Sequence, residues 1–98
     1  MLLLNKKIEN DSLYITLKGK LTEKEVRDFK FHFLPYLQDQ ELKFVICNCK
    51  DLKKIDYLGK LALLKLKLSL KSVKKKLILS DVSNELKESF IGYRMRIL

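Results

Sequence analysis

The sequence predicts an α/β domain built on a mixed sheet of four to five strands with two to three helices. Short apolar runs of strand character alternate along the chain with segments of helical spacing. Strands that are separated by helices need crossover connections, so their pairing is expected to be parallel. The first two apolar runs are separated only by the polar turn "ENDS", which predicts an antiparallel hairpin at the N-terminus.

The N-terminal half is expected to contain this hairpin and one amphipathic helix. The second run, "LYITLKG" at residues 13–19, alternates apolar and polar side chains as a half-buried strand does. The helix follows within residues 21–37, and Thr22 with Glu25 three positions later forms a capping box at its start. Pro35 should end or bend the helix near its last turn. The apolar stripe that packs on the sheet consists of Val26, Phe29, Phe33 and Leu37.

The C-terminal half is expected to contain two further strands and two further helices. In "LKFVICNC", residues 44–46 are apolar in succession, which predicts a central strand covered on both faces. Residues 58–73 fit both periodicities, but their length without a turn signal favours a helix. A third core strand at 77–79 and a short helix at 83–90, capped by a serine, come next. The closing "GYRMRIL" forms either a short edge strand or an irregular tail.

Length and composition predict one globular domain spanning residues 1–98. The chain has 98 residues, of which 47% are hydrophobic and 34% charged, and it has one proline and three glycines. No apolar run approaches the roughly 20 residues that a membrane-spanning helix needs. The opening "MLLLNKK" is too short in apolar residues for a signal peptide. A cytoplasmic location is therefore expected.

The residues that carry chemistry in enzymes are sparse in this sequence. Cys47 and Cys49 would share one face of a strand, and we expect them to be reduced and buried. His32 is the single histidine, so no metal-ligand set is complete. A Gly-rich phosphate loop is missing, and no pair of carboxylates has an obvious base beside it. We predict a protein that is not an enzyme and that has neither a cofactor nor a metal.

The net charge of +9 comes mainly from lysine, since only three of the 21 basic residues are arginine. Lysine is poorly suited to bidentate recognition of base edges, which argues against a dedicated reader of nucleic-acid sequence. Loose attraction to an acidic protein, to nucleic acid or to anionic lipid remains compatible with the charge. The only dense basic run is "KSVKKK" at 71–76, and a solvated face is its ordinary explanation.

The order and spacing of these landmarks resemble the STAS domain (sulphate transporter and anti-sigma factor antagonist). The likeness begins with "LKGKL" and the capped helix from Thr22, and continues through "FVICNCKDLKKID" to Gly59 and the leucines behind it. "KLILSDVS" and "FIGYRMRIL" complete it, so that it covers nearly the whole chain. Each motif alone is weak, and the specificity lies in their joint order.

The resemblance implies a strand-to-helix turn of the form Asp-Ser/Thr-x-Gly, whose hydroxyl a partner kinase phosphorylates in anti-sigma factor antagonists. Asp56 matches the aspartate of this turn and Gly59 matches the glycine. Tyr57 stands at the phosphorylation position and Leu58 replaces the small residue after it. Residues 50–68 contain no serine or threonine, so the usual switch is expected to be missing. Tyr57 is thus a degenerate phosphorylation position.

The resemblance further implies a bacterial regulatory module without enzymatic activity that docks through Asp56, Tyr57, Leu58, Gly59 and Lys60. Two partners fit: an anti-sigma factor or related ATP-binding switch protein, and the ATPase of an ABC (lipid) transporter, as in small STAS accessory subunits. A purely structural role for the same turn is the alternative, in which the aspartate caps the helix, the tyrosine packs locally and the glycine permits close approach to the sheet. A basic binder of nucleic acid or anionic surfaces is a third reading.

Overall fold

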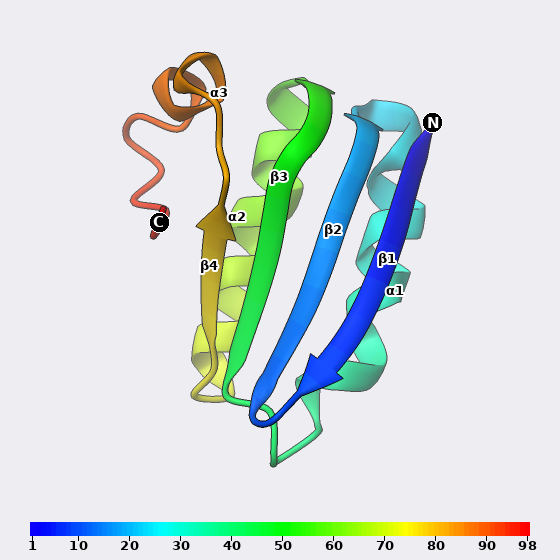
Figure 1. The fold of residues 1–98 in the computed structure, drawn as a ribbon, viewed down its shortest axis with the longest axis vertical. Coiled ribbons are helices and arrows are strands. Elements are labelled where there is room, and N and C mark those ends of the chain that lie inside the picture. Colours follow the sequence, from blue (N-terminus) through cyan, green and yellow to red (C-terminus); the bar gives the residue numbers. More distant parts are fainter.

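The computed structural model describes residues 1–98 and has two layers, a four-stranded sheet with α1 and α2 on one face (Figure 1). The strands are β1 (Leu2–Glu9), β2 (Ser12–Leu21), β3 (Phe44–Ile55) and β4 (Lys76–Ser80). The helices are the 3-10 turn η1 (Glu23–Glu25), α1 (Val26–Leu37), α2 (Tyr57–Ser72) and α3 (Asn84–Ser89). The predicted fold class is confirmed.

The sheet has the order β1-β2-β3-β4 and mixed pairing, as the connections require. β1 and β2 form the antiparallel hairpin, whereas β2 with β3 and β3 with β4 are parallel. The C-terminal tail adds a single parallel bridge, between Ile97 and Leu79, at the free edge of β4. The amide of Leu79 donates to the carbonyl of Arg96, and the amide of Leu98 donates to Leu79, both at 2.8 Å. The tail is therefore irregular and joins the sheet through this one bridge.

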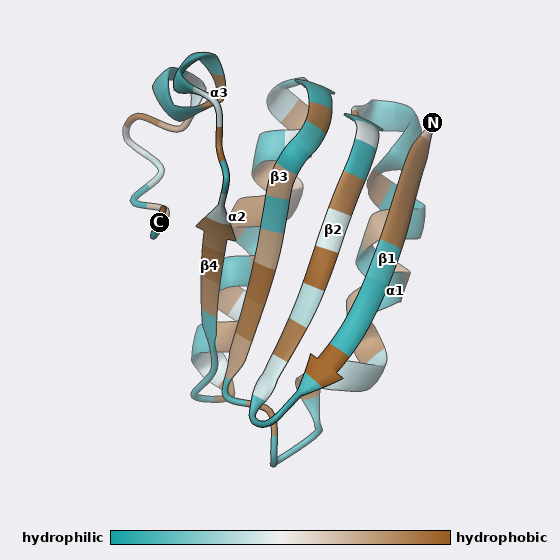
Figure 2. Ribbon diagram, in the orientation of Figure 1, coloured by the Kyte–Doolittle hydropathy of each residue, from teal (hydrophilic) through white to brown (hydrophobic).

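The hydrophobic core lies between the sheet and the helix layer. Along β2 the buried residues alternate with more polar ones, which Figure 2 shows as a banded strand. Cys47 and Cys49 project from β3 into this core, where both are buried free thiols, as expected. The fully buried anchors of the core are Leu13, Ile15, Leu17, Leu21, Phe29, Leu42, Val45, Leu63, Leu70 and Leu79.

The second face of the sheet has no helix on it, so the prediction that β3 is covered on both faces was wrong (Figure 1). Val45 of β3 points into the core, whereas its neighbours Phe44 and Ile46 point to the other face and are only half-buried. Tyr14 and Ile78 flank Ile46 in register on the adjacent strands. Contact between such cross-strand neighbours, rather than a second helix layer, shelters the apolar run on that face.

The helix starts follow the predicted capping chemistry. The amide and the hydroxyl of Thr22 both donate to Oε1 of Glu25, at 3.0 and 2.6 Å. Ser83 accepts from the amide of Leu86 at 3.2 Å and caps α3. Pro35 lies inside α1, which ends shortly beyond it at Leu37. None of the helices combines the length and the apolar character that crossing a membrane requires.

Candidate functional site

The turn between β3 and α2 is fixed by Asp56. This residue has an extended backbone and is the N-cap of α2, where its Oδ1 accepts a hydrogen bond from the amide of Gly59 at 2.8 Å. Its carbonyl accepts from the amide of Lys60 at 3.0 Å and begins the helical ladder. A carboxylate at this position also complements the positive end of the helix dipole. The capping role that the sequence suggested for Asp56 is confirmed.

The same carboxylate also joins two turns that are far apart in the sequence. Oδ2 of Asp56 accepts from the amide of Glu23, the first residue of η1, at 3.0 Å. The amide of Asp56 donates to the carbonyl of Leu21 at the end of β2, at 3.4 Å. Asp56 thus ties the turn before α1 to the turn before α2, and both of its side-chain oxygens are engaged. Sequence reasoning missed the partner Glu23, since no local motif signals it.

Gly59 is buried where the first turn of α2 touches the end of β2. A Cβ atom at this position would overlap the carbonyl oxygen of Leu21 and would lie 2.8 Å from Cγ1 of Ile55. The backbone conformation here is helical, so the glycine is required for space and not for a positive φ. The close approach that the sequence suggested is confirmed.

The remaining three site residues have their side chains on or near the surface. Tyr57 is 63% exposed and Leu58 is 40% exposed, so the tyrosine does not pack locally as the structural alternative supposed. Lys60 is half-buried, and its ammonium lies 5.9 Å from the ring centroid of Tyr93, a cation–π distance. The contribution of Tyr93, from the C-terminal tail, could not be read from the sequence. Tyr57 and Leu58 therefore face outward from a turn that Asp56 and Gly59 make rigid, whereas Lys60 lies near Tyr93 of the C-terminal tail.

The titratable groups of the chain do not form a catalytic constellation. Burial in the core raises the pKa of the Cys47 thiol well above its ordinary range and that of Cys49 to about 12. Both thiols therefore stay protonated and poorly nucleophilic. His32 is on α1, where its Nδ1 lies 3.3 Å from the ammonium of Lys6 and away from the Asp56 turn. The turn offers a contact surface and no nucleophile with a base beside it.

Comparisons with solved structures show the same fold in several proteins. The phosphorylated form of the Bacillus cell-fate determinant SpoIIAA is 19% identical, with a TM-score of 0.77 over 100% of this chain and 89% of that one. A putative anti-sigma factor antagonist from Thermotoga maritima is 15% identical, with a TM-score of 0.79 over 96% and 84%. The murine anion transporter Slc26a9 is 13% identical, with a TM-score of 0.78 over 93% of this chain and 16% of its own.

The family assignment comes from the sequence itself. None of the curated proteins compared matches the chain. The model of the STAS domain family matches residues 4–93, which include every strand from β2 onward, all the helices and the Asp56 turn. This chain belongs to the STAS domain family.

Proposed function

We propose that the chain is a regulatory module without enzymatic activity that binds another protein through the turn at the start of α2, in the bacterial cytoplasm. The observation that carries the proposal is the exposure of Tyr57 and Leu58, side by side on a turn whose other two residues are fixed by the fold. Tyrosine is enriched in binding hot spots because it offers a large, rigid contact area. A rigid turn also loses little conformational entropy on binding.

Binding at this turn is proposed to be constitutive. One similar structure is of SpoIIAA in its phosphorylated form and another is of its unphosphorylated form, so that protein occurs in both states. In this chain Tyr57 occupies the position that corresponds to the phosphorylated hydroxyl of the family. A phenol oxygen stands much farther from the backbone than a serine hydroxyl, and a Ser/Thr kinase is not expected to modify it. Without the added charge, the docking surface keeps one state.

The charge around the turn favours an acidic partner surface. Lys53 and Lys54 are exposed at the end of β3, and Lys60 follows in the first turn of α2. Carboxylates on a partner would complement these ammonium groups and accelerate association. We propose an anti-sigma factor or a related ATP-binding switch protein as the partner, and the ATPase of an ABC (lipid) transporter as the alternative. Both would bind at the same turn.

Co-purification from the native host tests the docking site, followed by titration of the purified partner. The test variant combines Tyr57→Ala with Lys60→Glu. The matched control combines Phe31→Ala with Lys30→Glu on α1, because Phe31 is an equally prominent aromatic at 60% exposure and the change in charge is the same. Circular dichroism melts of both variants confirm that each remains folded.

The proposal requires that the Tyr57 variant lose the partner while the Phe31 variant retains it. We expect the affinity to fall at least about 30-fold for the former, since hot-spot residues cost about 2 kcal/mol or more when truncated. Recovery of the same partners by both variants would place the contact surface elsewhere on the domain. The nature of the recovered protein, a switch kinase or a transporter ATPase, decides between the two candidates.

A further inference from the structure

One face of the sheet is not covered by a helix, and the pairing of the strands shows which side chains share it (Figure 1). Leu13 and Ile15 of β2 are buried in the core, so Tyr14 between them points to the other side. Paired residues of adjacent strands lie side by side on the same face. We call this surface the open face. One row across it, from β1 to β4, consists of Lys7, Tyr14, Ile46 and Ile78.

We propose that the open face binds single-stranded RNA. Bases stack on Tyr14 and Phe44, and the cations around these two rings neutralise the phosphates. Aromatic rings within a basic surface are the usual platform for single-stranded nucleic acids, because every base has a face that can stack. The lysine-rich composition suits this mode of binding, which needs no bidentate recognition of base edges. The site is separate from the docking turn and goes beyond the proposed function.

The two aromatic residues are close neighbours on adjacent strands. Tyr14 pairs with Ile46, which comes two positions after Phe44, so the two rings are diagonal neighbours on one face. Tyr14 is 43% exposed and Phe44 is half-buried, and neither belongs to the hydrophobic core. Beside them Ile78 is only 8% exposed. A recessed apolar floor suits flat bases better than a membrane, which requires apolar side chains that project from the surface.

Positive charge predominates on the open face. Its two acidic residues are Glu9 and Asp51, and Glu9 forms an ion pair with Lys7 at 3.4 Å. Lys76 lies beside Phe44 in register and takes part in no ion pair. Two carboxylates are thus outnumbered by six cations, which suits a polyanion. The six cations are Lys7, Lys18, Lys20, Lys54, Lys76 and Arg96.

Arg96 belongs to this set through the C-terminal tail. Ile97 forms the bridge to Leu79 and packs against the core. The exposed Arg96 directly before it therefore lies on the outer side of the tail, next to Ile78. The row that begins with a lysine on β1 thus ends with an arginine at the edge of β4.

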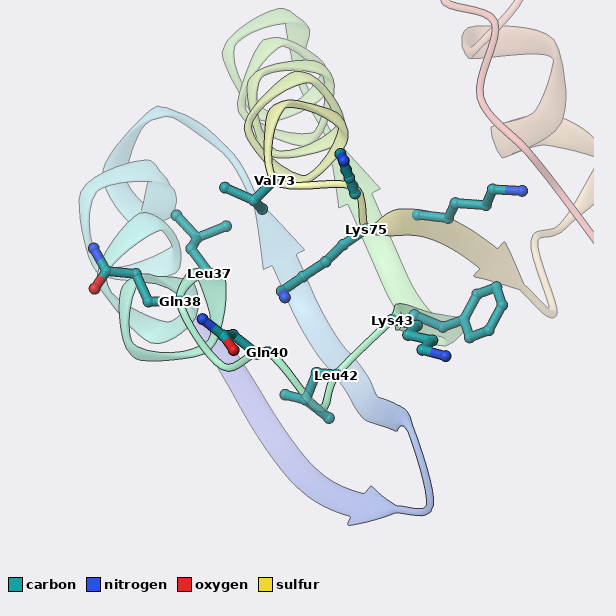
Figure 3. A pocket seen from close by; sticks show the side chains of 10 residues that line it. Leu37, Gln38, Gln40, Leu42, Lys43, Val73 and Lys75 are labelled. Carbon is teal, nitrogen blue, oxygen red and sulfur yellow. The ribbon is translucent and has the colours of Figure 1, made fainter.

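The neighbouring Lys75 does not contribute to the open face. It is buried, and its side chain extends toward the loop that holds Gln40, where its ammonium donates to the carbonyl of Asp39 at 2.6 Å (Figure 3). Successive residues of an extended segment point to opposite faces, so Lys76 points away from this loop. Of these two lysines, only Lys76 is therefore available on the open face.

A polar row beside the aromatic residues favours RNA over DNA. Hydroxyl and amide side chains both donate and accept hydrogen bonds, as recognition of the ribose 2′-hydroxyl requires. Oδ1 of Asn48 accepts from the amide of Lys50 at 2.8 Å, which leaves the side-chain NH₂ group of Asn48 to donate to a ligand. Across the four strands this row consists of Asn5, Thr16, Asn48 and Ser80.

A second copy of the chain fits the open face less well than RNA does. Two such faces packed against each other would oppose cations with cations, because each has six cations and only two carboxylates. Like charges brought together in an interface disfavour association. A single strand of RNA instead supplies one negative charge with each base.

Fluorescence anisotropy with a labelled oligouridine of about ten nucleotides, at low salt, tests the proposal. The test variant is Tyr14→Ala. The matched control is Phe31→Ala, because Phe31 is an exposed aromatic on α1, on the other side of the sheet. We expect the affinity of Tyr14→Ala to fall at least about fivefold and that of the control to stay within about twofold of wild type. No binding by wild type, or equal losses in the two variants, would overturn the proposal.

The salt dependence of binding tests the cations separately. Lys76→Gln with Arg96→Gln removes two charges from the open face, whereas Lys30→Gln with Lys65→Gln removes two exposed charges from the helices. For the first pair, the slope of log affinity against log salt should become smaller by about 1.4, since each contacted phosphate of a single strand contributes about 0.7. For the second pair the slope should not change. Equal slopes in the two double variants would contradict phosphate binding at the open face.

Tyr14→Trp gives a signal from the site itself, because the chain contains no tryptophan. Stacking of a base on the introduced indole should quench its emission as oligouridine is added. Phe31→Trp is the control, and its emission should stay constant. Quenching in both variants or in neither would overturn stacking at this position. Circular dichroism melts confirm that every variant remains folded.

Three further measurements would reveal a different occupant. Tighter binding of oligothymidine than of oligouridine would assign the open face to DNA. Binding to vesicles of phosphatidylcholine with phosphatidylglycerol that Tyr14→Ala abolishes, without oligouridine binding, would assign it to a membrane surface. A dimer in sedimentation that Tyr14→Ala abolishes would assign it to a second copy. Each of these results would overturn the proposal. Tyr57→Ala should bind oligouridine as wild type does, so that failure of the docking turn and failure of the RNA site are distinguishable.

Discussion

Replacing Gly59 with alanine tests whether the first turn of α2 is fixed against the sheet by lack of space. On helix propensity alone the change should stabilise the protein by about 1 kcal/mol, because glycine is the weaker helix former. The added Cβ, however, would overlap the carbonyl oxygen of Leu21 and approach Cγ1 of Ile55 to 2.8 Å. Leu21 and Ile55 pair at the ends of β2 and β3, so neither backbone can retreat without breaking the ladder.

The magnitude follows from the difference between these two effects. Overpacking a closed site costs up to about 3 kcal/mol of stability. The better helix propensity of alanine offsets about 1 kcal/mol of this cost. We therefore expect Gly59→Ala to lower the free energy of unfolding by about 2 kcal/mol. For a domain of this size that loss lowers the melting temperature by about 8–16 °C. Urea unfolding followed by circular dichroism measures the free energy, and a thermal melt measures the midpoint.

Ser69→Ala is the matched control, because Ser69 is exposed on the same helix. It changes helix propensity without a steric conflict and should raise the free energy of unfolding by about 0.5 kcal/mol. The two variants should therefore move stability in opposite directions. If Gly59→Ala proved as stable as wild type or more stable, propensity would dominate and the close approach of α2 to Leu21 would not constrain this position.

Three further predictions concern the cap, an acidic group and the thiols. Asp56→Ala should lower the free energy of unfolding by about 1–2 kcal/mol more than Asp56→Asn in urea titrations, because asparagine still accepts from Gly59; equal losses would argue against the cap. Hydrogen bonds from the Thr22 hydroxyl and amide hold the pKa of Glu25 below its ordinary value of 4.5. The stability that Glu25 contributes is thus present above pH 4.5 and lost as the pH falls through its lowered pKa, so Glu25→Gln should flatten the acid limb of a melting-temperature profile. Burial raises the pKa of both thiols, that of Cys49 to about 12. A disulfide reagent at pH 8 should therefore label the two cysteines only after unfolding. Labelling of the native protein within seconds would contradict their burial.

Local patterns in the sequence were sufficient to predict most of the fold. The alternation in β2, the capping pair Thr22 and Glu25, and the uninterrupted length of α2 each depend on neighbours within a few residues. The prediction that β3 is covered on both faces was wrong because an apolar run alone does not show whether a second helix layer covers its outer side chains. Val45 faces the helices, and the half-buried Phe44 and Ile46 face the open side of the sheet.

The features that could not be predicted are those that long-range pairing creates. Asp56 and Glu23 are 33 positions apart and become hydrogen-bonded only because β2 and β3 lie side by side. The backbones of Lys43 and Lys76 likewise meet only because β3 and β4 pair in parallel, so that the amide of Lys76 donates to the carbonyl of Lys43 at 3.0 Å.

The Asp56 turn separates the residues that build the fold from those available for contact. Both carboxylate oxygens of Asp56 accept hydrogen bonds from backbone amides, and Gly59 has no room for a side chain. Substitution of either residue should therefore lower the stability of the domain. Tyr57 and Leu58 make no such contribution, and substitutions at exposed positions of this kind usually change stability by less than about 0.5 kcal/mol. The fold accounts for Asp56 and Gly59 but not for an exposed tyrosine beside an exposed leucine, and this difference is the physical argument for the docking role that we propose for Tyr57 and Leu58.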